Sequence, residues 1–356
     1  MKSIIKSTGV IILLSIIVLS LLTSCGGPSE TTTPAETTTP AQTTKPPTTP
    51  VQTTTPPTTA PTTPTTTTPA PTTIEITDQA DRTVTLEGIP ETIISLSPSN
   101  TEILFALGLG DKVAAVTQYC TYPAEAQEKT KIGGFSPTDI DVSIEQIVAL
   151  DPDLILATET HLAEVVPKLE QLVPEATVLV ILTQTESFEV IFEAIEMIGK
   201  CTGAGDRADQ ILTDMKARIK AITDVTDQLQ ESEKPKVLYI VWNDPIFAIG
   251  GGTLGNTLIE AAGGINIFAD TEGAPMTDLE TIIYRNPDVM LGSLNVGTGM
   301  DMAYQFILND ERLAGVNARL NNQVYGANDD WYGRPGPRLV LALEELAKWL
   351  HPELFP

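Results

Sequence analysis

A long stretch rich in threonine and proline, residues 26–73, limits where this chain can fold. Its only charged residues are Glu30, Glu36 and Lys45, and it has few apolar side chains. Such a segment buries too little apolar surface to offset the conformational entropy that folding costs. Proline keeps the chain extended, so these 48 residues reach up to about 150 Å at about 3.1 Å per residue. Folded structure is therefore expected only in residues 74–356.

The residues in front of Cys25 are typical of an export signal. Two lysines open the chain, and an apolar run follows at 10–22. The run is shorter than the roughly 20 apolar residues that cross a bilayer, so it is interpreted as the core of a signal peptide. Leu-Thr-Ser-Cys at 22–25 resembles the bacterial lipobox, in which the cysteine becomes the lipid-bearing N-terminus. We expect a signal peptide at 1–24, then a lipidated Cys25 and a linker that end at residue 73, with a plain secretory signal as the alternative.

The folded part is strongly acidic. Residues 1–73 contain two of the 46 acidic and three of the 21 basic residues, which leaves a net charge of −26 for residues 74–356. A surface with this charge repels nucleic acid and anionic lipid. We therefore predict no nucleic-acid partner, and membrane attachment only through the lipid.

Few residues suit metal or covalent chemistry. The chain has two histidines, His161 and His351, where a site for a bare transition metal needs several. Cys120 and Cys201 either pair or remain free buried thiols, and the second interpretation is favoured. No phosphate-binding loop, dinucleotide fingerprint or nucleophile elbow is present. We expect no catalytic residue, no metal and no resident cofactor; a lipid-anchored metallohydrolase or esterase is the rival class.

Strand and helix patterns alternate along the folded part. Short apolar runs rich in β-branched residues predict six strands, at 92–97, 112–117, 153–157, 177–182, 236–241 and 288–291. Alternation of this kind is typical of α/β layers with largely parallel sheets.

An internal sequence repeat and a long helical pattern suggest two similar lobes. EQIVALDPDLILAT at 145–158 and ETIIYRNPDVMLGS at 280–293 share five residues at a constant offset of 135, each copy being a helix, a turn and a strand. Between the copies, residues 204–231 have the pattern of one helix, which at about 1.5 Å per residue spans roughly 40 Å. A helix of that length is able to bridge two lobes.

Four segments occur in an order that is typical of one protein family. They are IISLSPSNTEILFALGLGDKVAAVTQYCTYP, SIEQIVALDPDLILAT, GNTLIEAAGGINIF and DDWYGRPGPR. Together they resemble class III periplasmic-type binding proteins, which serve ABC importers of cobalamin, iron-siderophores and haem. The resemblance covers roughly residues 92–352. It implies two Rossmann-like α/β lobes joined by a single long helix, with the ligand in the cleft between them.

The resemblance also sets the expected domain boundaries and partners. An N-terminal lobe at 74–203, a connecting helix at 204–234 and a C-terminal lobe at 235–356 are expected. The expected partners are the permease and ATPase subunits of an ABC importer and a small-molecule ligand, and the chain is expected to be monomeric and extracytoplasmic.

The likeness is greatest to cobalamin binders, which hold a macrocycle between aromatic faces. The residues that fall at corrin-contacting positions are Tyr119, Phe135, Asp330, Trp331, Tyr332 and Arg334, with Trp242 as an additional wall. Flat rings bury a large area against a flat macrocycle, while Asp330 and Arg334 suit peripheral amides and the nucleotide phosphate. Phe135 departs from the tryptophan of the closest relatives. For each aromatic residue, packing in the core is the alternative role.

Two other ligand classes stay open. Anionic ferric siderophores usually need a cluster of arginines, and the folded part has few. Haem binders usually offer a tyrosine or histidine to the iron, and several tyrosines are available. A ferric siderophore or haem is therefore the alternative ligand.

The resemblance also predicts where the importer docks. In the family, one glutamate at the top of each lobe pairs with arginines of the permease, and Glu145 and Glu260 occupy the matching positions. The alternative for each is an ordinary glutamate on a helix surface, with Glu145 favoured by the dipole at its helix N-terminus.

Overall fold

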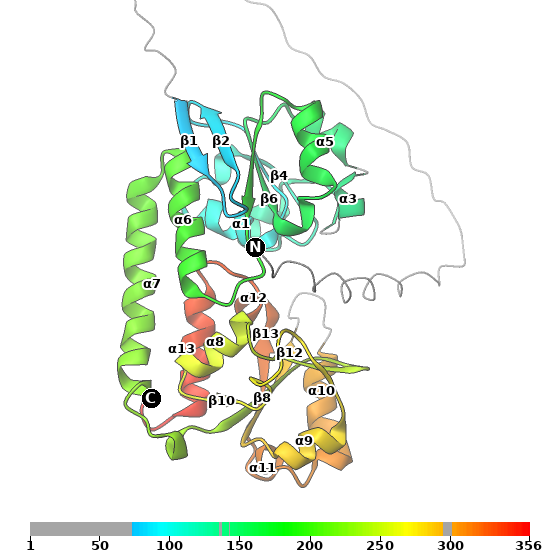
Figure 1. The fold of residues 1–356 in the computed structure, drawn as a ribbon, viewed down its shortest axis with the longest axis vertical. Coiled ribbons are helices and arrows are strands. Elements are labelled where there is room, and N and C mark those ends of the chain that lie inside the picture. The colour runs from blue at the N-terminus through cyan, green and yellow to red at the C-terminus, as the bar shows by residue number, and fades with distance from the viewer. Residues whose placement is uncertain (1–72, 135–136, 142, 295–300) are drawn as a thin grey trace, which may run out of the picture. The chain divides into compact units, whose positions relative to one another are not determined.

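The computed structural model describes residues 73–134, 137–141, 143–294 and 301–356 (Figure 1). The predicted signal peptide, Cys25, the linker up to residue 72 and Phe135 lie outside the described residues. The described part contains two large sheets and a separate hairpin of β1 (Thr73–Thr77) and β2 (Thr83–Glu87).

The first sheet is parallel and has the order β5-β4-β3-β6-β7. Its strands are β3 (Ile93–Ser95), β4 (Val113–Val116), β5 (Thr130–Lys131), β6 (Leu154–Thr158) and β7 (Thr177–Ile181). The helices of this lobe are α1 (Pro98–Ala106), α2 (Ala124–Gln127), α3 (Pro137–Asp141), α4 (Ile144–Ala149), α5 (Val165–Leu172) and α6 (Phe188–Thr202). Every residue of β6 and β7 is buried, as expected for strands covered on both faces.

The second sheet has the order β11-β9-β8-β12-β13, with β10 paired to β8. Its strands are β8 (Lys236–Asn243), β9 (Ile246–Ala248), β10 (Ile265–Asn266), β11 (Met276–Thr277), β12 (Val289–Leu294) and β13 (Val324–Asn328). Strands β8, β12 and β13 are parallel, whereas β9 and β11 are antiparallel to their neighbours. Its helices are α8 (Leu254–Ala261), α9 (Leu279–Arg285), α10 (Met302–Asn309), α11 (Asn317–Leu320), α12 (Asp329–Tyr332) and α13 (Leu339–Leu350).

The prediction of six strands is confirmed, and so is the repeated helix-turn-strand unit. Helices α4 and α9 each lead into a buried strand. Asp151 and Asn286, which are equivalent in the two copies, both have a positive φ directly before a proline. Asp and Asn tolerate this backbone conformation better than most residues. Asp153 and Asp288 are also equivalent, and each accepts backbone N–H bonds at the start of the neighbouring strand.

The segment between the two sheets contains α6 and α7 (Gly205–Thr226), which pack side by side (Figure 1). Gly203 ends α6 in the left-handed conformation, with φ of 72°, which separates the two helices. Helix α7 is one continuous helix of 22 residues, shorter than the expected 204–234, because the chain turns after Thr226. That it is the single link between the lobes stays a prediction.

One hydrophobic core extends over both lobes. It joins residues of β3, β4 and β6 to residues of α6, α7, α8 and α13 and of the second sheet. Two smaller clusters cover the opposite faces, one among α4, α5 and the first sheet, the other around α10 and the second sheet. Since α7 contacts both α6 and α13, the helical layer is shared by the lobes.

Candidate functional site

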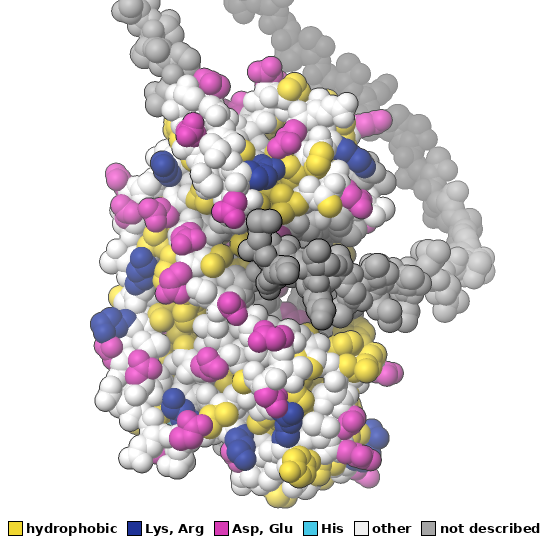
Figure 2. Space-filling view, in the orientation of Figure 1, with side chains coloured by type: hydrophobic (Ala, Val, Ile, Leu, Met, Phe, Trp, Pro, Cys, Tyr) yellow, Lys and Arg dark blue, Asp and Glu magenta, His cyan; other side chains and the backbone are white. Residues whose placement is uncertain are grey.

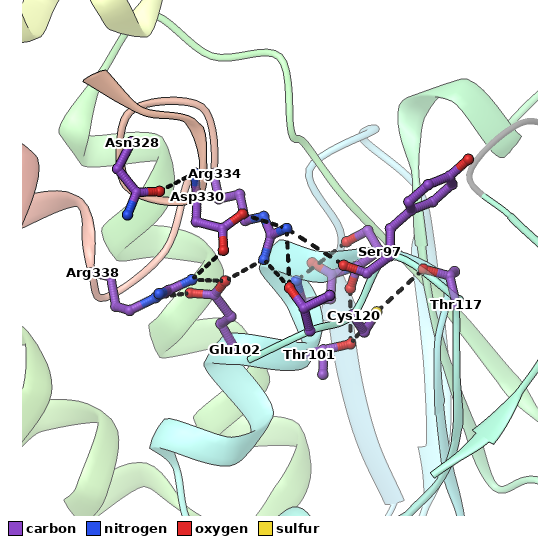
Figure 3. Close-up of polar contacts among 12 residues, drawn as sticks. Ser97, Thr101, Glu102, Thr117, Cys120, Asn328, Asp330, Arg334 and Arg338 are labelled. Carbon is purple, nitrogen blue, oxygen red and sulfur yellow. Dashed lines mark hydrogen bonds and ion pairs between the residues drawn. The ribbon is translucent and has the colours of Figure 1, made fainter. Parts of the chain in front are cut away.

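An ion-pair network joins the two lobes at the base of α1. Ser97 caps this helix by accepting a hydrogen bond from the Asn100 N–H, and Glu102 lies in the middle of the same helix. The Glu102 carboxylate accepts two bonds from Arg338 of the C-terminal lobe, at 2.7 Å from Nε and 2.6 Å from Nη2 (Figure 3). It also accepts a bond of 3.1 Å from Arg334 Nη1. The Glu102 side chain is only 2% exposed, so this contact is an interior one.

Arg334 is held by acceptors from both lobes. Its Nη2 lies 2.7 Å from Asp330 Oδ1, and Asp330 is in turn fixed because its N–H donates to the capping residue Asn328 (Figure 3). Longer contacts of 3.4 and 3.5 Å reach the Tyr119 carbonyl and the Thr121 hydroxyl. The predicted site residues Tyr119, Asp330 and Arg334 therefore do come together, with Arg334 already paired to carboxylates.

The two cysteines are buried and unpaired, in agreement with the interpretation as free thiols. Cys120 lies 3.1 Å from the Thr101 hydroxyl and 3.2 Å from the Thr117 hydroxyl (Figure 3). Burial raises the pKa of the Cys201 thiol to about 12, which keeps it protonated. Neither thiol is accessible enough to act as a nucleophile.

Exposed apolar side chains are contributed by each lobe. The Tyr119 side chain follows β4 and is 51% exposed. On the C-terminal lobe, Trp242, Phe247 and Met276 are opposite one another across β8, β9 and β11, so they form one row on the same face of the sheet. Trp242 is 43% and Met276 68% exposed, and the Trp242 indole N–H donates to the Asp244 carbonyl. Sequence reasoning missed Phe247 and Met276 because β9 and β11 are too short to show a pattern.

Tyr332 is a correction to the predicted site. It is 3% exposed, and its ring stacks on Trp349 and meets Tyr239 edge-on, with centroid distances of 6.2 and 5.9 Å. Its hydroxyl donates to Glu345, and burial raises its pKa well above the usual range. Tyr332 therefore belongs to the core, because α12 turns it inward, while Trp331 is only partly buried against the same core.

Asp329 opens α12 beside the network. Burial raises the pKa of its carboxyl, although a hydrogen bond with Ser293 and the charge of Arg334 oppose that shift. Asp330 next to it raises the pKa further. The start of α12 thus combines two carboxylates, of which one is held by Arg334 and the other is desolvated.

The two predicted docking glutamates are both exposed on helices. Glu145 lies in the first turn of α4, and Glu260 lies near the end of α8, where its carboxylate accepts a bond of 2.9 Å from the Asn256 amide. Each belongs to a different lobe. Their role in docking stays a prediction.

Acidic side chains are spread over the face of the molecule shown in Figure 2, with fewer basic ones between them. Among the described residues, no cluster of three or more His, Cys, Asp or Glu side chains is arranged to hold a metal ion. Within the same part of the chain, every helix is too short or too polar to cross a membrane.

The chain is similar to known proteins in both sequence and fold. Residues 93–330 match the family model described as periplasmic binding protein. An ABC transporter substrate-binding lipoprotein of Bacillus subtilis, YvrC, is 34% identical over 273 residues, which is 76% of this chain and 83% of that protein.

Two solved structures have the same fold. The vitamin B12-binding protein BtuF of Vibrio cholerae has a TM-score of 0.60 at 29% identity, covering 74% of this chain and 97% of that chain. The haem-binding protein RhuT of Roseiflexus has a TM-score of 0.63 at 25% identity, covering 74% and 99%. The two α/β lobes and these likenesses show that the chain belongs to the periplasmic binding protein family, whose members are the extracytoplasmic solute-binding proteins of ABC importers.

Proposed function

We propose that this protein is a lipid-anchored solute-binding protein that captures cobalamin or a related corrinoid and delivers it to an ABC importer. The observation that carries the proposal is that each lobe exposes flat side chains, while a polar network whose charges are already paired joins the two lobes. Such a site suits a large, flat molecule with an uncharged polar rim.

The apolar side chains supply the contact area. Tyr119 on one lobe and the row of Trp242, Phe247 and Met276 on the other present aromatic faces and a polarisable thioether. Aromatic rings bury large areas against flat partners, and methionine adapts to irregular ones. A corrin ring has both a broad face and irregular projecting groups.

The polar network supports the choice among ligands. Arg334 and Asp330 neutralise each other at 2.7 Å, and Glu102 accepts from both Arg334 and Arg338. Paired groups of this kind still offer hydrogen bonds to amides at their edges, whereas a ligand with several carboxylates would need unpaired cations. The site thus favours a corrinoid with amide side chains over an anionic ferric siderophore.

Haem is the second candidate, because of one specific observation. Tyr119, whose carbonyl contacts Arg334, is 51% exposed, and tyrosine is a known axial ligand of haem iron. The likeness to the haem-binding protein RhuT supports the same possibility, while the likeness to BtuF supports the corrinoid.

A titration of the purified full chain with cyanocobalamin, haem and a ferric siderophore distinguishes the ligands. Quenching of tryptophan fluorescence and calorimetry both report binding. We expect cyanocobalamin to bind at least tenfold more tightly than the others. Tighter binding of haem, with a visible spectrum that Tyr119→Phe changes, would replace the corrinoid by haem.

The anchor is tested separately, since Cys25 lies outside the described residues. The lipobox-like sequence and the likeness to the lipoprotein YvrC support lipidation. Cells given a labelled fatty acid are expected to label the wild-type protein and not the Cys25→Ser variant. Equal labelling of both proteins would exclude Cys25 as the attachment site.

A further inference from the structure

We propose that Glu102 determines the charge selectivity of the cleft by neutralising the two arginines in its floor. The inference rests on the proposed function only in that the floor lies within the ligand cleft. We define the cleft floor as Glu102, Asp330, Arg334 and Arg338. Its formal charge is zero, because two carboxylates oppose two guanidinium groups.

The geometry commits both arginines to protein acceptors. Arg338 binds the Glu102 carboxylate with two parallel bonds, at 2.7 and 2.6 Å, and its guanidinium lies 3.8 Å from the centroid of the Tyr122 ring. Arg334 shares Oε1 of Glu102 and takes Asp330 on its other side. The side chains of the two arginines are only 17% and 15% exposed. Bidentate pairs of this kind are strong and rigid.

Glu102 is the acceptor that the two arginines share. Asp330 lies 2.7 Å from Arg334 but 3.9 Å from Arg338, so it does not replace Glu102 for the second arginine. Without the Glu102 charge, the floor would carry a formal charge of +1 in a partly buried setting. Electrostatic attraction is much stronger there than in bulk water.

Three other charged groups near the floor make its surroundings more negative, not more positive. Arg218, which lines a pocket of about 420 Å³ with Glu102 and Arg338, is held by Glu344 at 2.7 and 2.8 Å. Glu125 lines the same pocket, and Asp329 lies close enough to Arg334 for their charges to interact. Both are acidic, so neither adds a cation that would attract an anionic ligand.

Glu102 thus makes the floor a surface that accepts amides and disfavours carboxylates. A ligand carboxylate that approaches Arg334 or Arg338 must compete with Glu102 and is repelled by its charge. A neutral amide of the same shape is not repelled by the Glu102 charge. The discrimination is between neutral and anionic versions of one ligand, which makes it measurable.

Three variants of the full chain change the floor charge in steps. Glu102→Gln gives +1, Arg338→Gln gives −1, and the double variant returns it to zero. The probes are cyanocobalamin and its monocarboxylate, in which one peripheral amide is hydrolysed. Haem and its dimethyl ester form a second matched pair, on a different macrocycle. The measured quantity is the ratio of the Kd of the anionic probe to the Kd of the neutral probe.

We expect this ratio to fall about tenfold in Glu102→Gln and to rise about tenfold in Arg338→Gln. A tenfold change corresponds to a fraction of the full Coulomb energy, because solvent and salt screen the charges. In the double variant the ratio should return to within about threefold of the wild type. A loss of packing alone would weaken both probes equally and leave the ratio unchanged. If Glu102→Gln does not fold, Arg338→Gln and the double variant still compare two floor charges.

The outcomes separate this inference from the proposed function. Binding of cyanocobalamin with the same ratio in all variants supports the corrinoid and overturns the role of Glu102. Binding of haem alone, with a ratio that follows the floor charge, rejects the corrinoid and supports Glu102. If neither pair of probes binds, both the corrinoid ligand and the role of Glu102 are rejected.

Discussion

Replacing Tyr119 by alanine tests whether the exposed aromatic side chains form the ligand contact. Tyr119 is 51% exposed. An aromatic side chain has roughly 200 Å² of surface to bury, so about 100 Å² remains for a ligand. At about 25 cal/mol per Å², complete burial contributes up to about 2.5 kcal/mol. Because the ligand covers the ring only in part, we expect Tyr119→Ala to weaken binding by about 1–2 kcal/mol, or roughly 5- to 30-fold.

Calorimetry with cyanocobalamin measures this loss, with haem as the second ligand. The matched control is Tyr284→Ala. Tyr284 is 88% exposed but belongs to α9, which packs on the opposite core cluster of the C-terminal lobe. The control should bind like the wild type. An unchanged affinity of Tyr119→Ala for a ligand that the wild type binds would remove this residue from the site.

Three further predictions concern docking, pH dependence and stability. The double change Glu145→Ala and Glu260→Ala should leave ligand affinity within about twofold but lower uptake by whole cells, most visibly at raised salt; normal uptake at matched protein levels would exclude both glutamates from the interface. Asp329→Asn should raise the Tm at neutral pH, because the raised pKa of Asp329 means that its ionised form opposes folding; the gain should shrink as the pH falls through that raised pKa, and a gain that grows in acid would contradict the assignment. Asp78→Ala should lower the free energy of unfolding in urea by about 2–4 kcal/mol, since it removes the acceptor of three backbone N–H groups, whereas Arg82 keeps Glu170 and the Val178 carbonyl as partners; a loss below about 1 kcal/mol would mean that water replaces the carboxylate.

The sequence predicted the layers of the fold because local patterns determine them. Apolar runs rich in β-branched residues predicted β3, β4, β6, β7, β8 and β12. The two copies of the repeated unit also share a backbone conformation, since Asp151 and Asn286 both have a positive φ. The end of α7 was placed too late, since residues 227–231 continue a polar pattern that a helix and a turn share. The hairpin of β1 and β2 was missed because its strands are short and largely exposed.

The site was less accessible to sequence reasoning. The resemblance predicted that Tyr119, Asp330 and Arg334 contact the ligand; the structure brings the three together, and their contact with a ligand stays a prediction. Glu102 was not singled out, because its contact with Arg334 joins positions 232 residues apart and depends on how the lobes pack. Tyr332 was misplaced for a geometric reason: successive helical residues point about 100° apart, so neighbours in α12 face different surroundings.

The proposed attachment through the N-terminal segment would have a mechanical consequence for the hairpin of β1 and β2. Tension from that segment would reach the folded part at Thr73, which pairs with Glu87 at the open end of the hairpin. A load applied there breaks the ladder bonds one after another, which requires less force than breaking them together. The opening would stop at Asp78, whose carboxylate is bonded to the Val180 N–H of β7 and to Arg82. The hairpin would thus yield first under tension, and its opening would withdraw Ile76 of β1 from the main hydrophobic core.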